Sequence, residues 1–115
     1  MVRVTELLHI TERSLWDAAR ASGAYEMSTR GKTLAEEGFI HCSLAHQLRG
    51  VADFLYGAYD GPDELVVLVI DSERVPVPVR FEAPEPGADE FPHIYGPLPV
   101  EAVTEVRHWG GGRVR

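Results

Sequence analysis

The pattern of apolar and polar positions predicts two helices in the first half of the chain and mostly strands in the second half. Continuous or alternating apolar runs are typical of strands, and apolar positions three and four residues apart are typical of helices. We expect strands at residues 2–10, 39–41, 65–70, 75–81 and 102–109, helices at 11–21 and 43–57, and a helical turn at 33–38.

The first expected helix follows a run that contains Leu7, Leu8 and Ile10. Thr11 or Ser14 would cap its start, because a side-chain hydroxyl can accept a bond from a free backbone N–H of the first turn. Gly23 would end the helix, since glycine readily takes the left-handed conformation found after a last helical turn.

The second expected helix carries Leu44, Leu48, Val51 and Leu55 at spacings of four, three and four residues. This spacing places all four side chains on one face. We expect Ser43 to cap this helix and Gly57 to end it.

The run from Leu65 to Ile70 is wholly apolar, which indicates a central strand covered on both faces. Pro76 and Pro78 place residues 75–81 at the edge of a sheet, because proline cannot donate a ladder hydrogen bond. Early helices followed by strands favour an α+β fold over alternating βαβ units. We expect one domain at residues 1–109, a loop at 83–90 and a flexible tail at 110–115.

Composition narrows the class of protein. The chain has 115 residues, a formal net charge of −7 and one cysteine, Cys42. A negative surface repels phosphate backbones, so non-specific nucleic-acid binding is not expected. The sequence shows no apolar run long enough to cross a membrane and no signal-peptide pattern, and a lone cysteine cannot form an internal disulfide. We therefore expect a cytoplasmic protein without a membrane partner.

The segment Phe39-Ile40-His41-Cys42-Ser43 is the strongest candidate for a functional site. His9 lies in a similar setting, and in both segments a hydroxyl residue follows two positions later: Thr11 and Ser43. Residues i and i+2 of a strand share a face, so the imidazoles and hydroxyls would contact one ligand. The start of the Ser43 helix would add N–H groups suited to an anion. The alternative is that His41 is a core residue bonded to a backbone carbonyl.

His93 and Tyr95 form a second candidate group, in a segment made rigid by Pro92, Gly96 and Pro97. They stand two residues apart, so both would point the same way in an extended segment. We expect them to close one side of the cleft formed by His9 and His41. The alternative is a surface turn with Tyr95 packed on the last strand. Tyr25, in a polar segment, is expected to cover the ligand.

Two other chemistries have little support in the sequence. Cys42 follows His41 directly, and adjacent strand residues point to opposite faces, so a Cys–His nucleophile is not expected. We expect a buried Cys42. His9, His41 and His93 lack the short spacings typical of metal sites, and we expect no metal.

Two segments, Glu-Gly-Phe-Ile-His-Cys-Ser at 37–43 and Phe-Pro-His-Ile-Tyr-Gly-Pro-Leu at 91–98, carry a family resemblance. The chain resembles the bacterial and plant domain of unknown function nine-five-two from about Leu7 to Val103. That family is grouped with the ADP-ribosyltransferase superfamily, near the RNA 2′-phosphotransferases. The resemblance implies an ADP-ribosyltransferase-like fold, in which two early helices pack on a mainly antiparallel split sheet.

The resemblance also implies roles for individual residues. His9 and Thr11 would contact the adenosine side of NAD, and Ser43 would lie beside His41 near the nicotinamide ribose. The chain departs from the phosphotransferases in lacking their extra N-terminal domain and their catalytic arginines at matching positions. The catalytic glutamate of protein-modifying ADP-ribosyltransferases also has no clear counterpart.

Two hypotheses follow. The first is an ADP-ribosyltransferase-like enzyme that binds NAD or another ADP-ribose-containing nucleotide. The second is a non-catalytic module of the same fold that binds a nucleotide or another small molecule. The expected catalytic residues are His41, His93 and Tyr95, and the expected cofactor-binding residues are His9, Thr11, Ser43 and Tyr25.

Overall fold

The computed structural model describes residues 5–110 of the chain. The helices are α1 (Arg13–Ser22), α2 (Leu34–Glu37) and α3 (Leu48–Tyr56). The strands are β1 (Glu6–Glu12), β2 (Ala24–Tyr25), β3 (Met27–Thr29), β4 (Lys32–Thr33), β5 (Ile40–His41), β6 (Leu65–Asp71), β7 (Val79–Glu82), β8 (Phe91–Ile94), β9 (Leu98–Pro99) and β10 (Val103–His108). The protein is therefore an α+β fold with antiparallel sheets, as the order of elements predicted.

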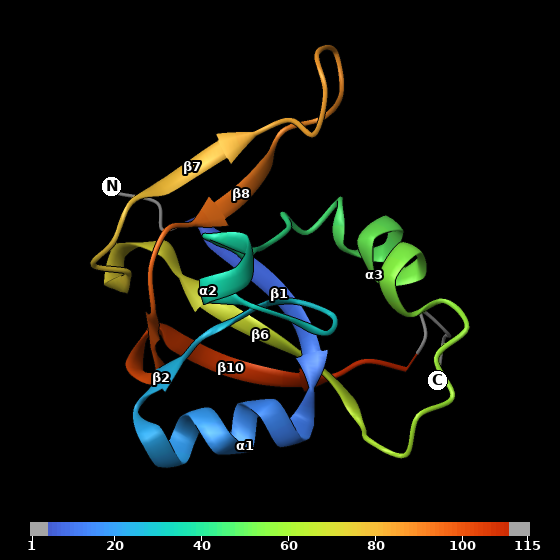
Figure 1. The fold of residues 1–115 in the computed structure, drawn as a ribbon, viewed down its shortest axis with the longest axis vertical. Coiled ribbons are helices and arrows are strands. Elements are labelled where there is room, and N and C mark those ends of the chain that lie inside the picture. Colours follow the sequence, from blue (N-terminus) through green and yellow to red (C-terminus); the bar gives the residue numbers. More distant parts are fainter. Residues whose placement is uncertain (1–4, 111–115) are drawn as a thin grey trace.

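The main sheet has the order β1-β6-β10, with β6 antiparallel to both neighbours (Figure 1). Its residues Val66 to Ile70 are all buried, which confirms that this apolar run forms a central strand. One face of the sheet packs with Trp16 of α1 and Tyr25 of β2. The other face packs with α3 through Ala52 and Tyr56, so both faces are covered.

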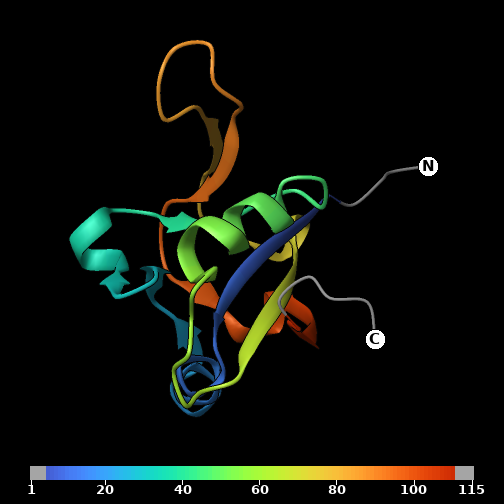
Figure 2. The ribbon, with the colours of Figure 1, turned by 90° about the vertical axis from the view of Figure 1, so that its right-hand side faces the viewer.

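A second sheet, of order β5-β8-β7, stands apart from the main sheet at the opposite end from α1 (Figures 1 and 2). Strand β7 lies at the edge of this sheet, as expected, but it begins at Val79, after both prolines of the expected strand at 75–81. The expected loop at residues 83–90 follows it and leads back into β8. Ile40 and Ile94 face each other across β5 and β8, and both are fully buried in the larger core cluster. One face of this sheet therefore belongs to the core.

Glycine ends the first two helices, as expected for Gly23 and for the helical turn at 33–38. Gly23 follows α1 with a φ of 98°, and Gly38 follows α2 with a φ of 89°. Both values lie in the left-handed region that side chains with a Cβ rarely adopt. Each glycine N–H bonds to a carbonyl of the last helical turn, on Ala19 and Leu34 respectively.

The expected start of the first helix is wrong. Thr11 is the sixth residue of β1, which runs on to Glu12, and Ser14 lies inside α1. The Ser14 hydroxyl bonds to Asp63 and caps no helix. Because Thr11 pairs with Val66 of β6, the extended strand continues past the residue at which the local pattern predicted its end.

The expected capping role of Ser43 is also wrong. Both backbone groups of Ser43 bond to Leu8: the Ser43 N–H donates to the Leu8 carbonyl at 2.7 Å and the Ser43 carbonyl accepts from the Leu8 N–H at 2.8 Å. This bridge ties the end of β5 to β1. Helix α3 begins only at Leu48, after a turn, and ends at Gly57 as expected.

The expected strand at residues 2–10 and the expected tail at 110–115 extend partly beyond the part of the chain that the structure describes. Of these segments, the structure describes residues 5–10 and Gly110. Within residues 5–110, no helix combines the length and apolar character needed to cross a bilayer.

Candidate functional site

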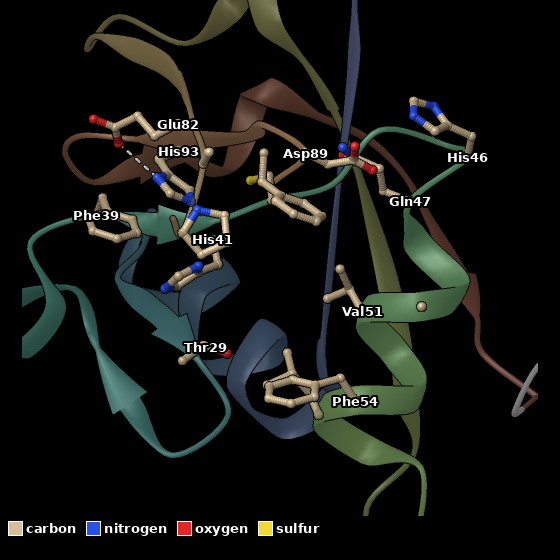
Figure 3. Close-up of a pocket in the computed structure, with 16 residues that line it drawn as sticks. Thr29, Phe39, His41, His46, Gln47, Val51, Phe54, Glu82, Asp89 and His93 are labelled. Atoms are coloured by element: carbon tan, nitrogen blue, oxygen red, sulfur yellow. Dashed lines mark hydrogen bonds and ion pairs between the residues drawn. The ribbon is translucent and has the colours of Figure 1, made fainter. Parts of the chain in front are cut away.

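A cleft of about 950 Å³ lies between the β5-β8-β7 sheet and helix α3. Figure 3 shows Phe39, His41 and His93 on one side of it, and Val51 and Phe54 projecting from α3 on the other. The volume is in the range of small-molecule sites, which is about 300–1,000 Å³.

Strand pairing explains which side chains of the small sheet reach the cleft. His41 pairs with His93, Arg80 also pairs with His93, and Glu82 pairs with Phe91. Directly paired residues share a face, and so do residues two apart on one strand. The sheet therefore presents His41, His93 and Glu82 together on the face away from the core.

Glu82 holds His93 and Tyr95 in place. The His93 Nδ1 lies 2.8 Å from Glu82 Oε1, and the Tyr95 hydroxyl donates to the same oxygen. The bonds from Tyr95 and His93 lower the pKa of the Glu82 carboxyl, which is therefore ionised at neutral pH. Because the carboxylate can only accept, His93 Nδ1 carries the proton of this bond.

His41 stands beside this group, as its ring centroid lies 5.0 Å from that of His93 in an edge-to-face arrangement. Its side chain is 37% exposed, and its Nε2 lies 3.9 Å from a Glu37 carboxylate oxygen. Partial burial, and then the nearby His93, lower the pKa of His41. The ring is thus neutral at pH 7 and able to accept a proton.

Phe39 packs against these rings and fixes their positions. Its ring stacks on His93 with a centroid separation of 4.1 Å and an interplanar angle of 24°, and it also contacts His41 and Tyr95. The result is a carboxylate and two neighbouring imidazoles in a mostly apolar cleft. Such a group can move protons at a bound ligand, which is general acid–base chemistry.

The structure brings His41 and His93 together as predicted, on one face of a sheet. It does not bring His9 to them, and the predicted three-histidine cleft is wrong in that respect. The His9 side chain points into the core and only 3% of the residue is exposed. His9 Nδ1 lies 2.5 Å from the backbone carbonyl of His41, so its connection to the site runs through the main chain.

His9, Tyr25 and Thr11 form a buried chain of hydrogen bonds. His9 Nε2 lies 2.7 Å from the Tyr25 hydroxyl, which lies 2.8 Å from Thr11 Oγ1. Burial lowers the pKa of His9 to about 4, so the ring is neutral. With Nδ1 donating to the His41 carbonyl, Nε2 must accept from Tyr25, and the Thr11 hydroxyl then donates to Tyr25.

The remaining expected ligand contacts also fall in the core. Tyr25 is 1% exposed and lies in β2, so the expectation that it covers a ligand from a polar loop is wrong. Thr11 and Ser43 are each 2% exposed. Neither they nor His9 and Tyr25 line the cleft. Because α3 begins at Leu48, the expected anion site at a Ser43 helix start is absent from residues 5–110.

Cys42 borders the cleft but is buried, as predicted, and burial raises the pKa of its thiol. A protonated thiol is a poor nucleophile. Across residues 5–110, no group of three or more His, Cys, Asp or Glu side chains has an arrangement that could hold a metal ion.

Sequence reasoning missed Glu82 and the α3 residue Phe54, and it did not predict that Phe39 packs on the histidine rings. A signal for Glu82 was present, since the loop at 83–90 joins two extended segments and a hairpin there pairs Glu82 with Phe91. Phe54 gave no such signal, because its position over the cleft depends on how α3 packs on the main sheet.

The family and structural comparisons agree. The family model described as "Protein of unknown function (DUF952)" matches residues 10–106, which include His41, Glu82 and His93. No curated protein sequence matches the chain significantly.

Among solved structures, the crystal structure of protein CC0527 from Caulobacter crescentus has a TM-score of 0.71 and 32% identity, and covers 90% of this chain and 85% of that one. The solution NMR structure of CC0527 has a TM-score of 0.65 and 34% identity, with coverage of 88% and 81%. The chain therefore belongs to the DUF952 family of proteins of unknown function.

Proposed function

We propose that the cleft binds NAD or another ADP-ribose-containing nucleotide, and that the protein is an ADP-ribosyltransferase-like enzyme. The observation that carries the proposal is the Glu82–His93–His41 group, which opens on a cleft of about 950 Å³. The pKa values of Glu82 and His41 are both lowered, and titratable groups with shifted pKa values in a cleft are typical of functional sites.

The group suits cleavage of the bond between nicotinamide N1 and ribose C1′. The bonding electron pair leaves with nicotinamide and the ribose becomes an oxocarbenium-like cation, which the Glu82 carboxylate would stabilise. Water or another nucleophilic acceptor then forms the new bond to C1′. Its proton passes to the free nitrogen of His93 or to His41. Tyr95 acts by holding Glu82 in position.

The charged residues in the cleft are acidic, and a basic residue lies beside it. The residues that line it include no lysine or arginine, whereas Glu82 and Asp89 are acidic. The cationic nicotinamide ring would therefore lie inside, against the phenyl rings. Arg80 has its guanidinium 5.1 Å from the Tyr95 ring centroid on the same sheet, so the pyrophosphate would extend toward Arg80.

Calorimetric titration with NAD and with ADP-ribose tests binding, and chromatographic detection of free nicotinamide tests turnover. We expect saturable binding of at least one ligand and slow nicotinamide release. His93→Ala should abolish release. Failure of both ligands to bind at millimolar concentration would reject this function.

The second candidate is a binding module that performs no chemistry. It is favoured by the state of Cys42, whose thiol stays protonated beside the cleft and supplies no nucleophile. Binding of NAD without nicotinamide release, and without a modified acceptor, would select this candidate over the enzyme.

A further inference from the structure

Aromatic side chains stand on both sides of the cleft. Phe39 lies on the small-sheet side, and Phe54 projects from α3 on the other (Figure 3). Phe91 of β8 also lines the cleft. Phe54 is 87% exposed, although phenyl rings are usually buried. Because Phe54 also lines the cleft, its exposed ring is available to a ligand bound there.

The charged groups of the cleft have one sign. Its lining includes the carboxylates of Glu82 and Asp89 and includes neither lysine nor arginine. Both hydrogen bonds to Glu82 use Oε1, from His93 and from Tyr95, so neither occupies Oε2. Glu82 is ionised and His41 is neutral near pH 7, which leaves the cleft negative.

The same sheet face already holds one planar cation on an aromatic ring. The Arg80 guanidinium lies 5.1 Å from the ring centroid of Tyr95, whose hydroxyl bonds to Glu82. The face of an aromatic ring attracts cations because its electron density is concentrated there. A ligand cation between Phe54 and the sheet would meet the same combination of ring and carboxylate.

We propose that the cleft selects a planar organic cation, of the amidinium or guanidinium type, with Glu82 Oε2 and Asp89 as its anionic partners and Phe54 as its ring contact. The inference rests on the proposed function only in placing the ligand in this cleft. It goes further by assigning the charge and shape of the recognised group, and by giving α3 and the loop at 83–90 a role in recognition.

Three probes of nearly equal shape test the charge. Benzamidine is a planar cation, benzamide is neutral and benzoate is an anion. By calorimetry or by chemical-shift titration of the full chain, benzamidine should bind about tenfold more tightly than benzoate, because one charge-assisted hydrogen bond contributes roughly that factor. Benzamide should fall between them. Equal or tighter binding of benzoate, or no binding of benzamidine, would overturn the proposal.

Variants locate the contacts. Asp89→Asn should weaken benzamidine binding several-fold and leave benzamide binding unchanged. Glu82→Gln should weaken benzamidine binding more than benzamide binding. Phe54→Ala should weaken both, and its 87% exposure keeps the fold intact. The control is Asp17→Asn, which removes one negative charge from exposed α1 without altering the cleft. If Asp17→Asn had the same effect as Asp89→Asn, only the net charge of the protein would matter.

The outcome is separable from that of the proposed function. Benzamidine binding without NAD binding would leave the cation site in place and reject the nucleotide. NAD binding with no preference for benzamidine over benzoate would support the proposed function and reject the cation site.

Discussion

Two histidine networks meet at His41 and differ in what surrounds them. The inner network links Thr11, Tyr25 and His9 in the core and ends at the backbone carbonyl of His41. The outer network links Glu82 and His93, and the His93 ring contacts that of His41 in the cleft. In both, a partner fixes one ring nitrogen of a histidine.

The difference lies in the second nitrogen. Both ring nitrogens of His9 have hydrogen-bond partners within the protein, so neither is available to a ligand. The bond of His93 to Glu82 uses only Nδ1, and the residue lines the cleft. The same side chain therefore stabilises the fold in one place and is able to react in the other. The inner network also holds the main chain on which the outer one is built.

The largest effect should come from breaking the inner network. His9→Ala leaves a cavity and deprives Tyr25 and the His41 carbonyl of a partner. Cavity and lost hydrogen bonds together should lower the free energy of unfolding by about 4 kcal/mol. Urea denaturation measures this loss. The matched control is His46→Ala at the exposed rim of the cleft, which should change stability by less than about 0.5 kcal/mol. Equal losses would remove the distinction between buried and open histidines.

Acid should act on the same network. The pKa of His9 is lowered from 6.5 to about 4 in the folded protein, so the unfolded chain binds a proton more readily. The contribution of neutral His9 to the free energy of unfolding is complete above pH 6.5. It is lost as the pH falls toward 4, and the total loss is about 3 kcal/mol. Carboxylates such as Glu82 also titrate near the acid end.

The comparison with His9→Gln isolates the His9 contribution. Glutamine does not titrate, and its amide can donate to the His41 carbonyl. The stability of the native protein should therefore fall more steeply between pH 6.5 and 4 than that of the variant. Parallel curves would show that His9 is already neutral in the unfolded chain or charged in the folded one.

The contrast between the networks also explains what the sequence could predict. Local pattern was sufficient for the central strand at Leu65–Asp71, for the glycine ends at Gly23 and Gly38, and for the shared face of His41 and His93. In each case the determining interactions lie within a few residues or follow from the alternation of a strand.

The local sequence pattern failed to predict the structure where a distant segment of the chain forms a competing contact. Ser43 precedes apolar residues at helical spacing, but its backbone pairs with Leu8 and the helix starts later. His9 and Thr11 do share a face, as predicted, yet that face is covered by Tyr25. Which face of β1 is open depends on what packs against it, and that information lies outside the local sequence.

A smaller effect should follow from removing one oxygen. Tyr25→Phe keeps the buried ring and deletes the hydroxyl that joins His9 to Thr11. The free energy of unfolding should fall by about 1–2 kcal/mol, since two buried groups lose a partner. A double-mutant cycle with Thr11→Val should show coupling, because both changes remove the same hydrogen bond. Strict additivity would show that the three side chains do not act as a chain.

The smallest effect on stability, and the largest on binding, should come from His41→Ala. The His41 side chain is 37% exposed, and the bond from His9 is to its backbone carbonyl, which the substitution retains. The free energy of unfolding should change by less than about 1 kcal/mol. The affinity for whichever ligand the titrations identify should fall about tenfold, because one polar contact is lost. His9→Gln, measured at pH 7, is the matched control, because it alters the inner network and leaves the cleft side chains in place. If His41→Ala instead lowered stability as much as His9→Ala and left affinity unchanged, His41 would be a core histidine and the outer network would have no functional role.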